Sequence, residues 1–243
     1  MRAFPIAAVE EAPRLFTAAT YNIHRCYGAD GKYEPDRIVQ VIRSLKSDII
    51  GLQEVDSRIP AGFGLTQLEY ITMFTKYRSL VGPCIRDLYG CYGNALLTRL
   101  PITDYRLIDL SVKGREPRGA IDVDLDAHGA PLRVIVTHLG RSYSERGIQA
   151  KKLVEHIGKP GDVPVVVMGD FNEWFPLSGN LRFLYDKMGK AAVRATFPSR
   201  LPIFPLDRIW LLHGGKNRDQ QVLSTEVSKV ASDHLPVVMN FQI

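Results

Sequence analysis

The segment that most constrains the fold of this chain is residues 163–172, which read Val-Pro-Val-Val-Val-Met-Gly-Asp-Phe-Asn. The apolar run before Gly169 is too short for a helix and rich in β-branched residues, so it predicts a strand that is buried on both faces. Asp170 and Asn172 follow, and an extended backbone would project both side chains to the same side. They either cap backbone amides in a turn or belong to a catalytic site, and this segment alone leaves both interpretations open.

The composition indicates one globular domain. Of 243 residues, 45% are hydrophobic and 23% are charged, which is ordinary for a globular protein, and we find no repeat or composition break that would divide the chain. We therefore expect a single domain over residues 1–243, with residues 1–15 as a loose N-terminal arm. No apolar run approaches the ~18 residues of a membrane span, and no secretory signal is evident.

Cysteine usage and net charge narrow the class of protein further. The three cysteines form no Cys-x-x-Cys pair, so neither a disulfide framework nor a zinc ribbon is indicated, and we expect a cytoplasmic monomer. The formal net charge of +5 favours an anionic ligand. The basic residues are dispersed, whereas a dedicated nucleic-acid binder more often has a basic run or stripe.

Other predicted strands also end in polar residues. Residues 16–24, 48–54 and 132–139 read as strands, and a short strand over 206–210 and a terminal strand after residue 234 follow. The polar residues at these ends are Asn22, Glu54, His138, Asp170, Asn172, Asp207, Asp233 and His234. Taken alone, most of them are explained at least as well as turn formers or packed side chains, while Glu54 favours a functional role. Their recurrence favours a site beyond the strand ends, where ligands bind in α/β sheets.

The remaining elements are predicted from periodicity. We expect helices over about 34–46, 66–75, 144–157 and 177–188, and strands over 78–83, 91–98, 102–110 and 119–126. The last strand alternates apolar residues with Asp122, Asp124 and Asp126, which predicts a sheet with one solvated face. Asn94 and Arg118 are weaker candidates for contact with an anionic substrate, because a structural asparagine and a surface arginine explain them as well.

Seven short motifs in this order resemble the endonuclease/exonuclease/phosphatase superfamily of metal-dependent phosphoesterases. They are Tyr-Asn-Ile-His (21–24), Leu-Gln-Glu-Val (52–55), Gly-Asn-Ala-Leu-Leu-Thr (93–98), Thr-His-Leu (137–139), Gly-Asp-Phe-Asn (169–172), Leu-Asp-Arg-Ile (206–209) and Ser-Asp-His-Leu-Pro-Val (232–237). The resemblance implies a four-layer α/β sandwich (α+β), in which two face-to-face, mostly antiparallel sheets are flanked by helices. The short apolar runs themselves lean towards a parallel sheet.

The resemblance also implies a metal site. Hydrolysis of a phosphate ester requires a positioned water and stabilisation of the charge on the phosphoryl oxygens. We expect Mg²⁺, with Mn²⁺ as a substitute, because Mg²⁺ prefers oxygen ligands and usually takes one or two carboxylates. Glu54 is the expected first ligand with Asn22 beside it, and Asp233 is expected to act through water or at a second ion. His24 stands where some family nucleases carry an acid, so the number of ions stays open.

Catalytic roles follow from the same likeness and the chemistry of the side chains. Asp170 is expected to orient or deprotonate the attacking water, while Asn172 holds a phosphoryl oxygen. His234 is expected to contact the phosphate, with Asp207 fixing its orientation. His138 is either a second phosphate contact or the general acid.

Three functions are compatible with these residues. We favour a Mg²⁺-dependent phosphodiesterase or phosphatase that acts on a small-molecule or lipid-linked phosphate. A DNA or RNA nuclease is less favoured, because the chain has short loops and no basic run to grip a nucleic-acid backbone. A catalytically inactive phosphate-binding module is the third reading, and it is disfavoured because every polar position of the motifs is filled.

Overall fold

The computed structural model describes residues 14–158, 161–192 and 194–243. Residues 1–13 of the predicted N-terminal arm therefore lie outside the described residues. The strands are β1 (Leu15–Asn22), β2 (Ile49–Asp56), β3 (Pro60–Gly62), β4 (Leu65–Thr66), β5 (Arg78–Asp87), β6 (Gly90–Thr98), β7 (Ile102–Asp109), β8 (Gly119–Ala127), β9 (Ala130–His138), β10 (Val165–Asp170), β11 (Asp207–Leu212), β12 (Lys216–Val222) and β13 (Val237–Gln242). The helices are η1 (His24–Cys26), α1 (Pro35–Leu45), α2 (Gln67–Thr75), α3 (Tyr143–Ile157), α4 (Gly179–Met188) and α5 (Ser228–Ala231).

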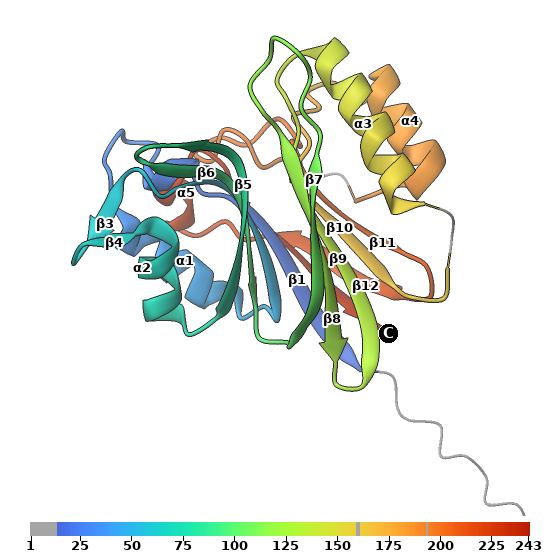
Figure 1. Cartoon of the computed structure of the whole chain (residues 1–243), viewed down its shortest axis with the longest axis horizontal. Helices are drawn as coiled ribbons and strands as arrows, with labels where there is room; N and C mark the ends of the chain where they lie inside the picture. Colours follow the sequence, from blue (N-terminus) through green and yellow to red (C-terminus); the bar gives the residue numbers. More distant parts are fainter. Residues whose placement is uncertain (1–13, 159–160, 193) are drawn as a thin grey trace, which may run out of the picture.

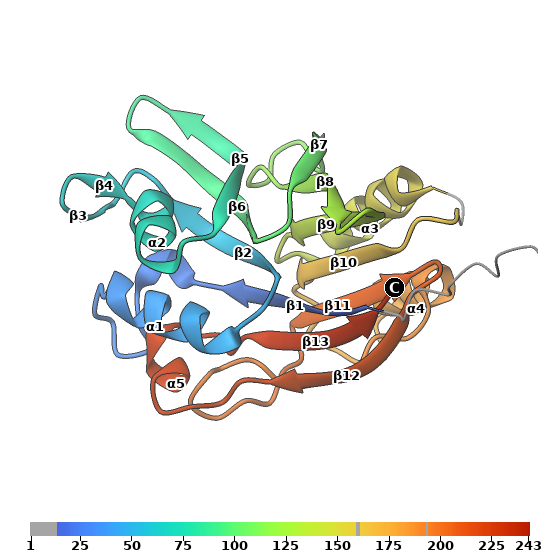
Figure 2. The ribbon, with the colours of Figure 1, turned by 90° about the horizontal axis from the view of Figure 1, so that it is seen from below.

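Two sheets pack face to face between helices, as the family resemblance implies (Figures 1 and 2). One sheet has the strand order β12-β13-β1-β2-β6-β5, and the other has the order β11-β10-β9-β8-β7. Helices α1, α2 and α5 lie outside the first sheet, and α3 and α4 lie outside the second (Figure 1). Each amphipathic element can bury its apolar side only against another layer, and this arrangement satisfies all four layers.

The core between the sheets is apolar and tightly packed. Ile49, Leu96, Val136, Met168 and further residues of both sheets form one buried cluster. At Gly51 a Cβ atom would lie only 2.9 Å from the Val136 side chain, so the missing side chain allows the sheets to approach closely. Two further clusters fill the spaces under α1 and α2 and under α3 and α4.

The parallel pairing that the short apolar runs predicted is correct for only two strand pairs. Strand β1 pairs with β2 in parallel, and β9 pairs with β10 in parallel, each pair joined through a helix. The other pairings described in the two large sheets are antiparallel. An apolar run shows that a strand is buried but does not show the direction of its neighbour.

Several elements have no counterpart among the predicted ones, namely η1, the short strands β3 and β4, strand β12 and helix α5. Strand β12 is an edge strand that joins the sheet through its backbone, and its mostly polar sequence carries no strand periodicity. Helix α5 has only four residues, too few for an amphipathic pattern. Among the described residues, every helix is too short or too polar to cross a bilayer.

The prediction that one face of β8 is solvated is wrong at Asp122, whose side chain is fully buried. Its carboxylate accepts hydrogen bonds from Arg133 (2.8 and 2.9 Å) and Arg106 (3.0 Å), and it lies 2.6 Å from Nε2 of His156 on α3. Although burial opposes ionisation, these partners hold the pKa of Asp122 well below its ordinary value. Helix α3 covers this face, and the acid is paired there instead of solvated.

We expect Asp122→Asn to lower the free energy of unfolding by about 3 kcal/mol or more, because it leaves the half-buried guanidinium groups of Arg133 and Arg106 without their carboxylate. A depressed carboxyl pKa stabilises the fold above the unfolded value of about 3.9 and loses that effect as pH falls. The difference between the variant and wild type should therefore shrink below about pH 4. Urea unfolding measures it, with the exposed Asp104→Asn on β7 as the control. Equal stability of both variants at pH 7 would contradict this role.

Candidate active site

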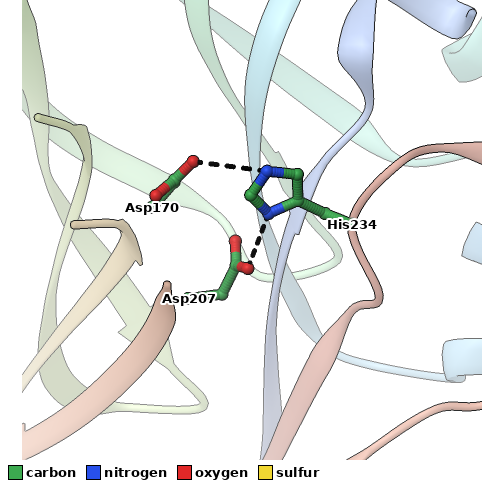
Figure 3. A group of neighbouring side chains, drawn as sticks. All are labelled: Asp170, Asp207 and His234. Carbon is green, nitrogen blue, oxygen red and sulfur yellow. Dashed lines mark hydrogen bonds and ion pairs between the residues drawn. The ribbon is translucent and has the colours of Figure 1, made fainter. Parts of the chain in front are cut away.

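The ends of strands from both sheets surround one cavity of about 360 Å³. Asn22 and Glu54 lie on β1 and β2 of the first sheet, while His138, Asp170 and Asp207 lie on β9, β10 and β11 of the second. His234 lies in the loop before β13, and Figure 3 shows its ring between the carboxylates of Asp170 and Asp207. The cavity is lined by Glu54, Arg118, His138, Asp170, Asn172, Asp233 and His234, together with residues that the sequence did not indicate.

Glu54 reaches this cavity through an irregularity in β2. The register between β2 and β6 shifts between Leu52 and Val55, and Glu54 has a left-handed backbone with φ 59°. A bulge of this kind re-aims a side chain next to a site, at a cost of about 1–3 kcal/mol for the unusual backbone. The carboxylate is half-buried and accepts one hydrogen bond, from Asn22 Nδ2 at 3.2 Å.

Asp170 and Asn172 lie on the same side, but not because the backbone is extended. Asn172 has φ 50°, a conformation that asparagine tolerates, and its backbone N–H donates to Asp170 Oδ1 at 2.8 Å. Both alternatives from the sequence therefore hold, since Asp170 caps a turn and also lines the cavity. Asn22 Nδ2 donates to the other oxygen, Asp170 Oδ2, at 3.2 Å.

His234 and Asp207 form a close buried pair. Nδ1 of His234 lies 2.8 Å from Asp207 Oδ2, and its Nε2 lies 3.7 Å from Asp170 Oδ2. Burial opposes a charged ring, but the carboxylates of Asp207 and Asp170 outweigh it and raise the pKa of His234 to about 10. At neutral pH the ring is an imidazolium with its Nε2–H directed towards Asp170.

His138 has the opposite electrostatic environment. Burial and the Arg118 guanidinium together lower the pKa of His138 to about 3, against the effect of Asp170. Nδ1 of this neutral ring lies 3.2 Å from Arg118 Nη1, which can only donate. Its Nε2 lies 3.5 Å from Asp170 Oδ2 and 3.1 Å from Asn172 Nδ2. A neutral ring fits the predicted role of His138 as a second phosphate contact better than its predicted role as the general acid.

The loop that carries Asp233 is tied to the end of β1. Ser232 Oγ donates to the carbonyl of Asn22 at 2.7 Å, and the backbone N–H of His24 donates to Asn22 Oδ1 at 3.0 Å. Asp233 is half-buried, and its carboxylate lies 3.7 Å from His24 Nδ1. Because His24 N–H occupies Oδ1 of Asn22, the Nδ2 of this amide is directed at Glu54 and Asp170 and orients their carboxylates.

A trio of residues and the single carboxylate of Glu54 are the two candidates to hold a metal ion. Asp170, Asp207 and His234 have ligand atoms within 4.8 Å of one another. However, Asp207 Oδ2 already lies 2.8 Å from Nδ1 of His234, so this trio fits a hydrogen-bonded chain better than a ligand set. The half-buried carboxylate of Glu54 faces the cavity with spare acceptor capacity and fits the oxygen preference of Mg²⁺.

The structure separates the two weaker candidates. Arg118 is buried, lines the cavity and pairs with Glu116 at 3.0 Å. Asn94 does not line this cavity. Its side chain donates to the carbonyl of Gly119 at 2.9 Å, which links the two sheets.

Sequence reasoning missed several residues of the cavity wall. They are Arg25, Arg58, Ile85, Tyr92, Glu116, Arg141, Trp174, Phe197 and Leu206. Most lie in loops, where no periodic pattern marks them. Trp174 had a usable signal, because it follows Asn172 by two residues.

The fold and the cavity together define the class of this protein. Facing sheets whose strand ends gather carboxylates, an Asp–His pair and an arginine form a site suited to hydrolysing a phosphate ester. The chain belongs to the Endonuclease/Exonuclease/phosphatase family, whose family model matches residues 19–234. Members of this family are generally hydrolytic phosphoesterases or nucleases.

Several known proteins are similar to this chain in sequence or in fold. "Uncharacterized protein YbhP" of Escherichia coli (strain K12) is 28% identical over 244 residues, which cover 91% of this chain and 94% of that protein. An endonuclease/exonuclease/phosphatase family protein from Bacteroides thetaiotaomicron has a TM-score of 0.79 at 19% identity, covering 96% of this chain and 99% of that one. The human nocturnin catalytic domain with bound sulfate has a TM-score of 0.74 at 22% identity, covering 94% and 97%. The two structures share the fold.

We expect Gly169→Ala to destabilise the protein by about 2 kcal/mol or more, because a Cβ there would lie 1.9 Å from the Thr137 carbonyl oxygen. The backbone of β10 must then move away from β9, and Asp170 moves with it. Thermal and urea unfolding measure the loss. Gly161→Ala is the matched control, since nothing lies within 4 Å of its added Cβ. Unchanged stability of Gly169→Ala would show that this strand contact is not restrictive.

Proposed function

We propose that this chain is a Mg²⁺-dependent hydrolase of phosphate esters, a phosphodiesterase or phosphatase for a small-molecule or lipid-linked phosphate. One observation carries the proposal: the ring of His234, held by Asp207, lies beside Asp170 in the cavity that Glu54 also lines. A general acid–base site, a cationic hydrogen-bond donor and an oxygen ligand for a metal are thus available to one substrate. The sulfate bound to the nocturnin domain, an anion with the shape of phosphate, agrees with an anion site in this fold.

Each side chain of the site has a separate role in the proposed reaction. Bound Mg²⁺ would supply positive charge near the phosphoryl group, held chiefly by Glu54, with Asp233 as a further candidate. Asp170 orients the attacking water and accepts its proton, because its carboxylate is fixed by Asn22 and by the Asn172 amide. His234 donates from Nε2 to a phosphoryl oxygen and stabilises the charge that develops there.

The other polar residues position these groups. Asp207 holds the His234 ring through Nδ1. Asn172 Nδ2 donates to the Leu139 carbonyl and faces His138, so it fixes the loop and the second histidine in addition to any contact with phosphate. His138 serves as a second contact to the phosphoryl group, and Arg118 adds a cation behind it.

We expect Asp170→Asn and His234→Ala each to lower kcat by about 10²-fold or more, the size expected for loss of an acid–base or electrostatic group. Circular dichroism and the unfolding midpoint should show a retained fold. His128→Ala, an exposed histidine outside the cavity, is the control and should keep wild-type turnover. Turnover close to wild type in either site variant would refute the assigned roles.

We expect Glu54→Gln to raise the Mg²⁺ concentration that supports half-maximal activity, since an amide oxygen is a weaker ligand than a carboxylate. The measurement is a Mg²⁺ titration of turnover at saturating substrate, repeated with Mn²⁺. An unchanged titration curve would count against Glu54 as a metal ligand.

A panel of phosphate esters tests the function itself. Mono- and diesters, lipid headgroup phosphates and oligonucleotides are each assayed with Mg²⁺ or Mn²⁺, and again with EDTA. EDTA-sensitive turnover of a non-nucleic ester supports the proposal. Preferred turnover of oligonucleotides with a steep loss at rising salt would favour the nuclease alternative. No turnover of any ester would favour an inactive phosphate-binding module.

A further inference from the structure

Six large apolar side chains are exposed on three segments that border the cavity. We name them the apolar rim: Leu88 and Tyr89, Phe175 and Leu177, and Leu201 and Ile203. Their exposed fractions range from 62% to 99%. Side chains of this size usually gather in the core, so their exposure on three segments around one cavity points to an interaction surface.

Each segment of the apolar rim continues from the cavity wall. Ile85 and Tyr92 line the cavity on either side of the β5–β6 hairpin tip that carries Leu88 and Tyr89. Trp174, also a lining residue, directly precedes Phe175. Figure 2 shows the β5–β6 hairpin projecting beyond the body of its sheet.

The other two segments contact each other and the candidate active site. The Trp174 ring packs edge-on against Phe197 (5.4 Å between centroids) and Phe204 (5.0 Å), which flank Leu201 and Ile203 in the chain. The Phe197 ring in turn lies 4.9 Å from the His234 ring. The exposed side chains of these two segments are therefore connected to His234 through the rings of Trp174, Phe197 and Phe204.

Exposed arginines accompany the apolar rim. Arg86 lies on the β5–β6 hairpin, and Arg200 directly precedes Leu201. Arg25 and Arg141 are exposed and also line the cavity. Apolar tips beside arginines, in a chain of net charge +5, suit a surface that presents both hydrocarbon and negative charge.

We propose that the apolar rim inserts into the interface of an anionic lipid bilayer, so that the cavity receives the phosphate of a lipid headgroup. Four of the six residues are aliphatic and cannot stack on nucleic-acid bases, which a single-strand binder requires. The six lie on three separate segments of the chain, whereas a stable protein interface usually has a contiguous buried core. The catalytic part of this inference rests on the proposed phosphoester hydrolysis, while the docking part stands on the surface alone.

The test is co-sedimentation with vesicles of phosphatidylcholine, with and without phosphatidylserine as a minor component. Wild type should bind the phosphatidylserine vesicles and lose binding at high salt. The rim variant Leu88→Ser/Tyr89→Ser should bind at least about tenfold less, because it removes two apolar anchors. The matched control is Tyr105→Ser/Leu107→Ser, which removes the same two residue types from exposed positions on the edge strand β7, outside the cavity lining. It should bind as wild type does.

Three outcomes would overturn the docking surface. Wild type that binds neither vesicle has no such surface, and equal loss of binding in both double variants would make it nonspecific. If the rim variant instead abolishes oligonucleotide binding or self-association of a wild type that ignores vesicles, the occupant is a nucleic acid or a second copy of the chain.

Turnover separates this inference from the proposed function. On a water-soluble ester that wild type hydrolyses, the rim variant should keep wild-type kcat and KM, whereas its turnover of a vesicle-embedded phosphate ester should fall with vesicle binding. Wild type that binds vesicles but hydrolyses no ester contradicts the proposed function and leaves the docking surface supported. Wild type that hydrolyses soluble esters but does not bind vesicles supports the proposed function and contradicts the docking surface.

Discussion

The face-to-face packing of the two sheets is the contact on which this structure depends. The apolar cluster between them holds the ends of β1 and β2 against the ends of β9, β10 and β11. Neither sheet carries a complete site, because Glu54 comes from one and Asp170 from the other. Asn22 spans the junction by donating to both carboxylates. A change that loosens this core therefore acts on both halves of the site.

The two buried histidines show how position decides chemistry within this site. His234 lies between two carboxylates, which raise its pKa, whereas His138 faces the Arg118 guanidinium, and burial and that cation lower its pKa. One ring is thus a cation at neutral pH and the other is neutral, although both approach Asp170. Pushing the pKa values of neighbouring groups apart in this way is common where an active site assigns different roles to like residues.

The likeness of the motifs to a known family predicted the architecture well, while periodicity predicted most elements to within a few residues. Side-chain surroundings were harder to predict. Asp122 followed an alternating pattern that indicates solvent, but helix α3 covers it and places His156 against it. Asn94 stands within a motif of the family, yet its amide links the sheets and does not line the cavity. Trp174 and Phe197 lie in loops, where no hydrophobic period distinguishes a wall residue from a solvated one.

The sequence by itself determined which polar residues end the apolar strands, and the order of those motifs identified the family. Strand ends are readable because burial imposes an apolar run and its interruption is local information. Only the tertiary structure decided which strands run parallel, how the bulge at Glu54 and the left-handed backbone at Asn172 aim their side chains, and which histidine is charged. These properties depend on atoms that are distant in the chain, because hydrogen bonds, Coulomb interactions and desolvation act through space and leave no pattern among sequence neighbours.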